Sequence, residues 1–209
     1  MKKILVTAAH SDDLVIGMGG TLKNLSTLGH KIWVVSACGD RISGFEDAMH
    51  HLGVEALSFP YRYGEIDEEE FSRKIEELFK KLKPDIVFTH WQNEILYDHE
   101  LVGRITLKIA RKEEKEVYLF EIPASSLNFD FDIAIDITDF FGHKKQAIEM
   151  MKDAFDEKVF LKEIMPSVVY TPGFRGIQVG CDFAEVFKHC GSRFPLAPFR
   201  KKLLDIARI

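Results

Sequence analysis

The sequence is poor in cysteine and has no long apolar run. Its three cysteines, at positions 38, 181 and 190, form no CxxC pair, which argues against a disulfide framework or a thiolate zinc site. The apolar residues after Met1 soon give way to polar and acidic ones, unlike those of a signal peptide. No stretch approaches the roughly 18 apolar residues of a membrane span. We therefore expect a soluble, cytoplasmic protein that does not enter the membrane.

A basic stripe is also lacking. The chain has 28 Lys and Arg residues against 33 Asp and Glu residues, and its formal net charge is -5. Nucleic acid is therefore not expected as the main partner, and a small molecule is. The 209 residues, of which 46% are hydrophobic, are compatible with one globular domain spanning 1–209.

What the sequence does contain is an alternation of strand and helix patterns. Short runs rich in β-forming residues predict strands, and runs with apolar residues at helical spacing predict helices. Residues 167–180, which contain Pro172 and three glycines, are predicted to form a loop with a short strand. The alternation predicts an α/β fold, with a mostly parallel sheet and helices on both faces. The predicted strands are 3–8, 31–37, 56–59, 85–89, 117–121 and 133–137, and the helices are 19–28, 68–83, one from about 98, and 141–155.

In sheets of this kind, sites form beyond the carboxyl ends of the strands. The segment His10-Ser11-Asp12-Asp13 directly follows the first predicted strand. Imidazole and carboxylate groups are good ligands for divalent transition metals. Because His10 and Asp13 are three residues apart, a turn can bring both to one ion, which leaves Asp12 free as a general base. The alternative is that an aspartate merely caps the following helix.

Glycines follow this turn, in the run Gly17-Met18-Gly19-Gly20-Thr21. The run is not the G-x-G-x-x-G pattern of dinucleotide-binding loops, and no acidic residue ends the second strand. We therefore interpret the glycines as allowing the helix to pack closely on the sheet.

A catalytic zinc needs about three protein ligands and an open position for water. His90 ends one predicted strand, and Asp98-His99 begins the next helix. His90 and His99 are both candidates on chemistry alone. Asp98 is placed either to cap the helix or to hydrogen-bond a metal-ligating side chain without touching the metal itself.

These motifs together resemble those of the LmbE-like (PIG-L) N-deacetylases. His10-Ser11-Asp12-Asp13 and its glycines are similar to that family's His-Pro-Asp-Asp-Glu and glycine signature. Thr89-His90 and Asp98-His99 are similar to its later Thr-His and Asp-His segment. Arg41 and the segment 182–187 also match in spacing.

The resemblance implies a Rossmann-like fold and hydrolysis of an N-acyl group, usually the acetyl of an N-acetylglucosamine-type sugar. It makes His10, Asp13 and His99 the metal ligands, and so selects His99 over His90. Asp12 becomes the general base, and Arg41 holds substrate. Zinc is the expected cofactor, with another divalent transition metal as the alternative, and a homo-oligomer is compatible with the family.

The sequence departs from the family at three positions near these motifs. Ser11 replaces Pro, which changes the stiffness of the turn but not its chemistry. Leu14 stands where the family usually has Glu, and Leu96 where it commonly has a histidine that helps the tetrahedral intermediate. Loss of such a donor costs on the order of 100-fold in rate or more. Two other functions therefore stay open: hydrolysis of a different amide or ester, and binding of a sugar or nucleotide without turnover.

Two basic groups remain. Arg175 is a candidate to bind a substrate hydroxyl, carboxylate or phosphate, with a solvated loop arginine as the alternative. Lys144-Lys145 is expected to lie on the solvated face of a helix.

Overall fold

The computed structural model describes residues 1–39 and 42–190, which form a seven-stranded sheet with the order β3-β2-β1-β4-β5-β7-β6. All neighbouring strands from β3 to β5 pair in parallel, and β7 runs antiparallel to both β5 and β6. The mostly parallel sheet predicted from the sequence is therefore confirmed. The strands are β1 (Lys3–Ala8), β2 (Lys31–Ser36), β3 (Glu55–Ser58), β4 (Ile86–His90), β5 (Glu116–Phe120), β6 (Ile133–Asp136) and β7 (Ala184–His189).

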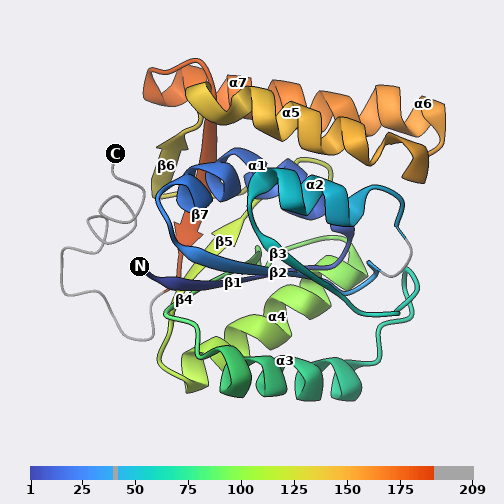
Figure 1. The fold of residues 1–209 in the computed structure, drawn as a ribbon, viewed down its shortest axis with the longest axis vertical. Coiled ribbons are helices and arrows are strands. Elements are labelled where there is room, and N and C mark those ends of the chain that lie inside the picture. Colours follow the sequence, from blue (N-terminus) through green and yellow to red (C-terminus); the bar gives the residue numbers. More distant parts are fainter. Residues whose placement is uncertain (40–41, 191–209) are drawn as a thin grey trace.

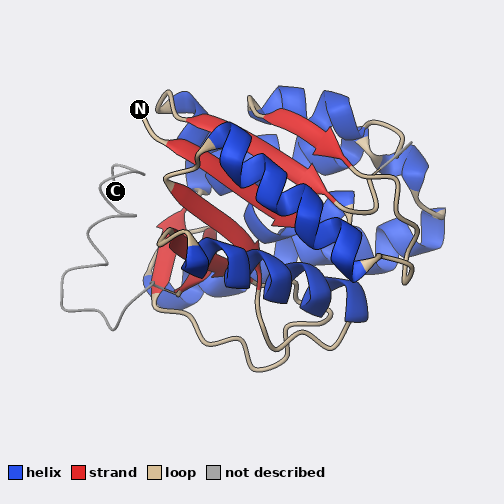
Figure 2. Cartoon of the chain, turned by 90° about the horizontal axis from the view of Figure 1, so that it is seen from below, coloured by secondary structure: helices blue, strands red, loops and turns tan. Residues whose placement is uncertain are grey.

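Helices cover both faces of the sheet (Figures 1 and 2). One face carries α1, α2, α5 and α7, and the other carries α3 and α4. Short 3-10 turns and a π-helical turn, Phe160–Ile164, complete the segments around α5 and α6. The helices are α1 (Ser11–Thr27), α2 (Phe45–Leu52), α3 (Glu68–Leu82), α4 (Tyr97–Lys112), α5 (Phe141–Met150), α6 (Glu157–Val159) and α7 (Met165–Val179).

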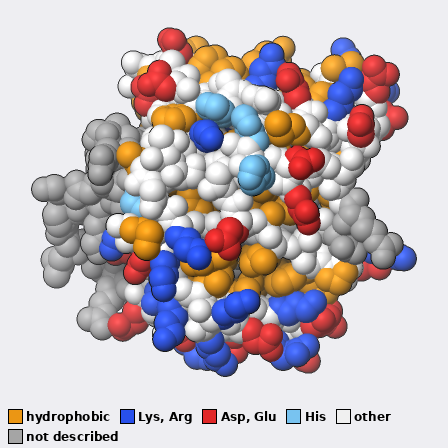
Figure 3. Space-filling model, viewed as in Figure 1, with side chains coloured by type: hydrophobic (Ala, Val, Ile, Leu, Met, Phe, Trp, Pro, Cys, Tyr) orange, Lys and Arg blue, Asp and Glu red, His pale blue; other side chains and the backbone are white. Residues whose placement is uncertain are grey.

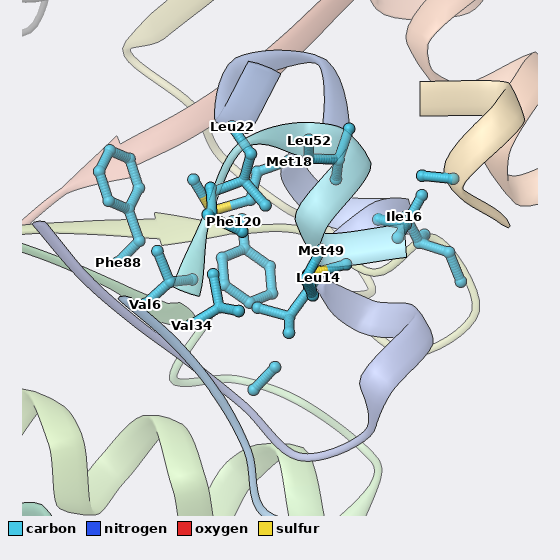
Figure 4. Close-up of a cluster of buried hydrophobic side chains, with 14 of the residues drawn as sticks. Val6, Leu14, Ile16, Met18, Leu22, Val34, Met49, Leu52, Phe88 and Phe120 are labelled. Carbon is cyan, nitrogen blue, oxygen red and sulfur yellow. The ribbon is translucent and has the colours of Figure 1, made fainter. Parts of the chain in front are cut away.

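The central strands are apolar on both faces, as parallel strands covered on two sides must be. Their side chains contribute to two buried clusters, one beneath α1, α2 and α5 and the other beneath α3 and α4. Figure 4 shows the first cluster, in which Val6, Val34, Phe88 and Phe120 of the sheet meet side chains of α1 and α2. The sheet is thus held from both sides, and its carboxyl edge has a fixed position.

The glycines of α1 allow this helix to lie close to the sheet. A Cβ atom on Gly17 would come within 2.5 Å of the Phe120 ring, and one on Gly20 within 2.7 Å of Ile137. The interpretation of the glycine run as a packing device is confirmed.

Helix α1 begins eight residues earlier than predicted and is kinked. Its backbone leaves helical geometry at Met18, where φ is -154° and ψ is 23°. The buried carboxylate of Glu185 on β7 accepts hydrogen bonds from Gly20 N and Thr21 N, at 3.0 and 2.7 Å. It therefore caps the second half of the helix beyond the kink.

The backbone carbonyl of Ile16, on the other side of the kink, accepts a hydrogen bond from Lys144. Its ammonium group donates to Ile16 O at 2.7 Å and to Glu185 Oε1 at 2.6 Å. Lys144 is 0% exposed, so the prediction that it lies on a solvated face is wrong. The reason is that the kink leaves a carbonyl and two amides that need charged partners inside the fold.

The segment 167–180 is also not a loop. It forms most of α7, with Pro172 inside the helix. A Cβ atom on Gly176 would lie 2.6 Å from the carbonyl oxygens of Cys181 and Asp182, so α7 approaches the start of β7 closely. Packing of this kind outweighs the low helix propensity of glycine and proline.

The surface carries charges of both signs. Figure 3 shows Lys and Arg together with Asp and Glu on the face in view, with Lys and Arg most numerous in its lower part. Among the described helices, none combines the length and apolarity required to traverse a lipid bilayer.

We predict that Lys144→Met destabilises the protein by about 3–5 kcal/mol, because it leaves the Glu185 carboxylate buried without its partner. Lys145→Met is the matched control, since the neighbouring Lys145 side chain is 48% exposed, and we expect a change within about 0.5 kcal/mol. Urea unfolding measures both. A Lys144→Met variant as stable as the control would contradict this account of the kink.

Candidate metal centre and active site

The candidate site lies between β1 and β4, at the carboxyl edge of the sheet. Strand β1 pairs with β2 on one side and with β4 on the other, so the chain order reverses at this point. Open α/β sheets bind their ligands at such a position. His10 follows β1, and His90 is the last residue of β4.

Three side chains converge there: His10, Asp13 and His99. The distance from His10 Nδ1 to His99 Nε2 is 3.1 Å. Asp13 Oδ2 lies 3.4 Å from His10 Nδ1 and 3.3 Å from His99 Nε2. Four donors placed tetrahedrally about 2.1 Å from one ion lie roughly 3.4 Å apart. The donor set and its spacing therefore fit a divalent transition metal.

The turn that carries His10 and Asp13 is fixed by the backbone. His10 N donates to Asp13 Oδ2 at 2.8 Å, so this carboxylate closes the first turn of α1 and faces the cluster as well. The helix-capping and metal-binding interpretations are therefore compatible for Asp13. Asp12, next to it, is half-buried and lines a pocket together with His10.

His99 is oriented by groups behind it. Its Nδ1 lies 3.1 Å from Ser125 Oγ and 3.5 Å from Glu94 Oε2, which directs Nε2 towards His10 and Asp13. Ser126 in turn donates a hydrogen bond to Glu94. Partners of this kind fix the tautomer of a metal-binding imidazole. The sequence analysis missed the two serines, although they follow β5 and the strand-end rule could have identified them.

His90 lies beside this cluster but has a different environment. Its Nε2 accepts a hydrogen bond from Ala9 N at 2.9 Å, and its ring stacks on that of His99 with centroids 4.2 Å apart. The side chain is completely buried. His90 is thus placed to support the position of His99 and of the turn after β1.

Asp98 connects the site to the loop between β3 and α3. Its Oδ2 accepts from Gly64 N at 2.8 Å and lies 3.2 Å from His10 Nε2. Tyr63, in the same loop, stacks on the His10 ring at 4.9 Å. Asp98 therefore holds both His10 and the loop that borders it.

The charges in the cluster act on one another strongly. Burial by itself would raise the pKa of Asp13, but the neighbouring His99, His90 and His10 hold it well below its ordinary value. Burial would lower the pKa of His10, but the hydrogen bond and charge of Asp13 raise it to about 9. The Asp13 carboxylate therefore favours the protonated forms of His10 and His99. A cation bound beside Asp13 would replace these protons.

Asp12 behaves in the opposite way. Burial raises its pKa, and the adjacent Asp13 carboxylate raises it further, to about 6. A carboxyl group whose pKa lies near neutrality can accept a proton and return it. Asp12 and Asp13 are neighbours in sequence, but their surroundings separate their chemistry.

The described residues contain two other groups of donors that could hold a metal: His10, Cys38 and Asp98, and His90, Glu94 and His99. Burial raises the pKa of the Cys38 thiol to about 12, which disfavours the thiolate that a metal needs. The second group is buried throughout. Of the three groups, only the one formed by His10, Asp13 and His99 combines favourable donors with the pocket and Asp12.

Two residues, Arg41 and Arg175, are predicted to bind substrate. Arg41 lies outside the described residues. Arg175 lies on α7, where its guanidinium forms a bidentate ion pair with Glu121 at 2.8 and 2.6 Å. It does not line the pocket at His10, so no contact of Arg175 supports the predicted role.

The two leucines that depart from the motif have different positions. Leu14 is 0% exposed and belongs to the core cluster under α1, where a carboxylate would have no solvent. Leu96 is half-buried and precedes α4. Neither supplies a polar group to the site.

Comparison with known proteins bears on these observations. Residues 37–110 match the model of the PIG-L family, described as GlcNAc-PI de-N-acetylase, so the resemblance drawn from the motifs is confirmed. The matched segment contains Arg41, His90, Asp98 and His99 but not the turn after β1.

Solved structures of similar fold include N,N'-diacetylchitobiose deacetylase from Pyrococcus horikoshii. It is 23% identical, the match covers 95% of this chain and 87% of that one, and the TM-score is 0.78. A 4-carboxy-2-hydroxymuconate hydratase from Pseudomonas putida is 19% identical, with coverage of 95% and 100% and a TM-score of 0.79. A zinc-inhibited form of teicoplanin deacetylase is 14% identical, with coverage of 89% and 97% and a TM-score of 0.69. The TM-scores show that these proteins share the fold of this chain.

We predict that His99→Gln removes bound zinc, whereas His90→Gln retains most of it. His99 Nε2 faces both His10 and Asp13, whereas His90 Nε2, although 3.3 Å from Asp13 Oδ2, accepts a hydrogen bond from Ala9 N. Loss of a group outside the ligand set costs about 10- to 100-fold in affinity rather than all of it. Elemental analysis of desalted, zinc-supplemented protein measures the stoichiometry. Retention of zinc by His99→Gln together with its loss from His90→Gln would reverse the assignment.

Proposed function

We propose that this protein, similar to the PIG-L family over residues 37–110, is a metal-dependent hydrolase that removes an N-acyl group from an amino sugar or a related small molecule. The observation that carries the proposal is the convergence of His10, Asp13 and His99 at 3.1–3.4 Å, beside a half-buried Asp12 in an open pocket.

In this proposal His10, Asp13 and His99 hold the ion. A divalent cation there supplies Lewis acidity, which polarises the acyl oxygen and acidifies a water molecule. Zinc suits two imidazoles and one carboxylate, as do other divalent transition metals.

Asp12 moves the proton. Its carboxylate accepts a proton from the attacking water as the new C–O bond forms at the acyl carbon. When the C–N bond breaks, Asp12 returns the proton to the departing nitrogen. The products are a carboxylic acid and an amine, which at neutral pH exchange a proton to become a carboxylate and an ammonium ion, so atoms and charge balance without a further reactant.

His90, Asp98 and Ser125 position the other groups. Ser125 lies at His99 Nδ1, and Asp98 lies at His10 Nε2. His90 accepts from Ala9 N and so fixes the turn in front of His10. Leu96 contributes no donor to the developing oxyanion, and we propose that the cation and nearby polar groups provide that stabilisation alone.

The fold does not by itself choose the reaction, since one structural neighbour is a hydratase. A hydratase also activates water, so hydration is the second candidate. The family match and the Asp12-Asp13 pair favour amide hydrolysis. Release of acetate from a panel of N-acetylated sugars and sugar nucleotides tests the proposal, and addition of water to 4-carboxy-2-hydroxymuconate tests the alternative.

We predict that Asp12→Asn lowers kcat by roughly 100- to 10,000-fold, because the amide cannot accept the proton. The variant should still bind zinc, since Asp12 is not in the ligand group. Steady-state acetate release and elemental analysis give the two quantities. A near wild-type rate in a zinc-loaded Asp12→Asn variant would exclude Asp12 as the base.

The pH profile should follow the same residue. A base works when deprotonated, so kcat/KM rises with pH through the pKa of Asp12, about 6, and falls about tenfold per unit below it. A bound cation favours the carboxylate, so the midpoint in the loaded enzyme lies at or below that value. Chelation with EDTA should abolish turnover and zinc should restore it. A profile that declines as pH rises from 5 to 7 would contradict the assignment.

A further inference from the structure

The pocket beside the cluster has two unlike walls. Its volume is about 500 Å³, within the usual range of small-molecule sites. One wall is formed by Tyr61, Arg62 and Tyr63 of the loop between β3 and α3. Another part of the lining is apolar and is formed by Met151, Ala154, Phe155, Val159 and Ile164.

The apolar wall comes from the segment between α5 and α7. Phe155 and Ile164 also pack against the core beneath α1, which holds the wall in place. Val159, at the end of α6, is half-exposed and belongs to neither core cluster. Its side chain is therefore available to a ligand and is not required to fill the interior.

A simple N-acetylated sugar does not match this wall. Its one methyl group covers little of Ala154, Phe155, Val159 and Ile164, which are all partly exposed, and the rest of their surface would stay in contact with water. Burial of a ligand methylene there would strengthen binding about fourfold. The polar wall suits sugar hydroxyls, since Tyr and Arg side chains supply hydrogen-bond groups and flat faces.

We infer, on the basis of the proposed function, that the substrate is amphiphilic: an N-acylated amino sugar with an apolar substituent of several carbons that lies against Val159 and its neighbours. The substituent is either a long acyl chain or an apolar group at the anomeric position. Both present the same chemistry to the wall.

Binding to zinc-loaded Asp12→Asn protein tests this inference without turnover. Three probes are compared by calorimetry: N-acetylglucosamine, N-hexanoylglucosamine and the hexyl glycoside of N-acetylglucosamine. We expect at least one hexyl-bearing probe to bind about tenfold more tightly than N-acetylglucosamine. Tighter binding of N-hexanoylglucosamine identifies an acyl-chain site, and tighter binding of the hexyl glycoside identifies an aglycone site.

Substitutions on the wall locate the effect. In the same background, Val159→Ser should reduce the advantage of the hexyl-bearing probe at least about threefold. Val159→Thr, which keeps the side-chain shape, should reduce it in the same direction. Leu161→Ser is the matched control, because Leu161 is close in sequence, 55% exposed and absent from the pocket lining. Thermal melting confirms that each variant is folded.

Equal affinity for the three probes, or an advantage that both Val159 variants retain, would overturn the inference. Hydrolysis by the wild-type protein is measured separately. Absence of acetate or hexanoate release alongside a clear binding preference would overturn the proposed function but support the amphiphilic site. Equal binding of the three probes together with measurable hydrolysis would support the proposed function and overturn the amphiphilic site.

Discussion

The buried carboxylate of Asp13 is the charge on which the site depends. It lies within hydrogen-bond or ion-pair distance of His10, His90 and His99, and it also accepts from the backbone of His10. A buried carboxylate without partners would be costly. The surrounding imidazoles come from the ends of two strands and the start of α4. The same need for compensation that stabilises Asp13 therefore brings together the donors that a cation requires.

Much of the arrangement could be predicted from the sequence because it follows from local rules. Alternating strand and helix patterns fixed the parallel sheet, and the strand-end rule placed His10 and His90 at one edge. Six of the seven strands were located to within a residue or two, and four of them, β1, β2, β4 and β5, are buried along almost their whole length. The choice of His99 over His90 came from the resemblance to a family, and the hydrogen bonds of the two rings are consistent with it.

What the sequence could not give depends on contacts between distant segments. Lys144 resembles a surface lysine beside Lys145, and only the kink at Met18 explains its burial. The helix α7 contains proline and glycines, which locally favour a loop, yet its packing on β7 decides the outcome. Ser125 and the pocket wall around Val159 carry no motif, because their roles arise from position alone.

The site also lacks a polar group that the resemblance led us to expect. Leu14 is built into the core, and Leu96 stands before α4 with no donor to offer. His10, Asp13 and His99 form a donor set that could hold an ion, whereas the residues at these two positions are apolar. The pocket beside the cluster is also apolar over part of its lining. The chain thus combines a polar cluster of possible ligands with a pocket that is apolar over part of its lining.

The capping of α1 by Glu185 has a consequence for how the protein is made. The turn with His10 and Asp13 leaves the ribosome well before Glu185, which follows it far along the chain. Until β7 joins the sheet, the amides of Gly20 and Thr21 lack the partner that completes the helix. The nascent chain therefore carries the turn with His10 and Asp13 on a helix whose second half is uncapped until Glu185 has been made.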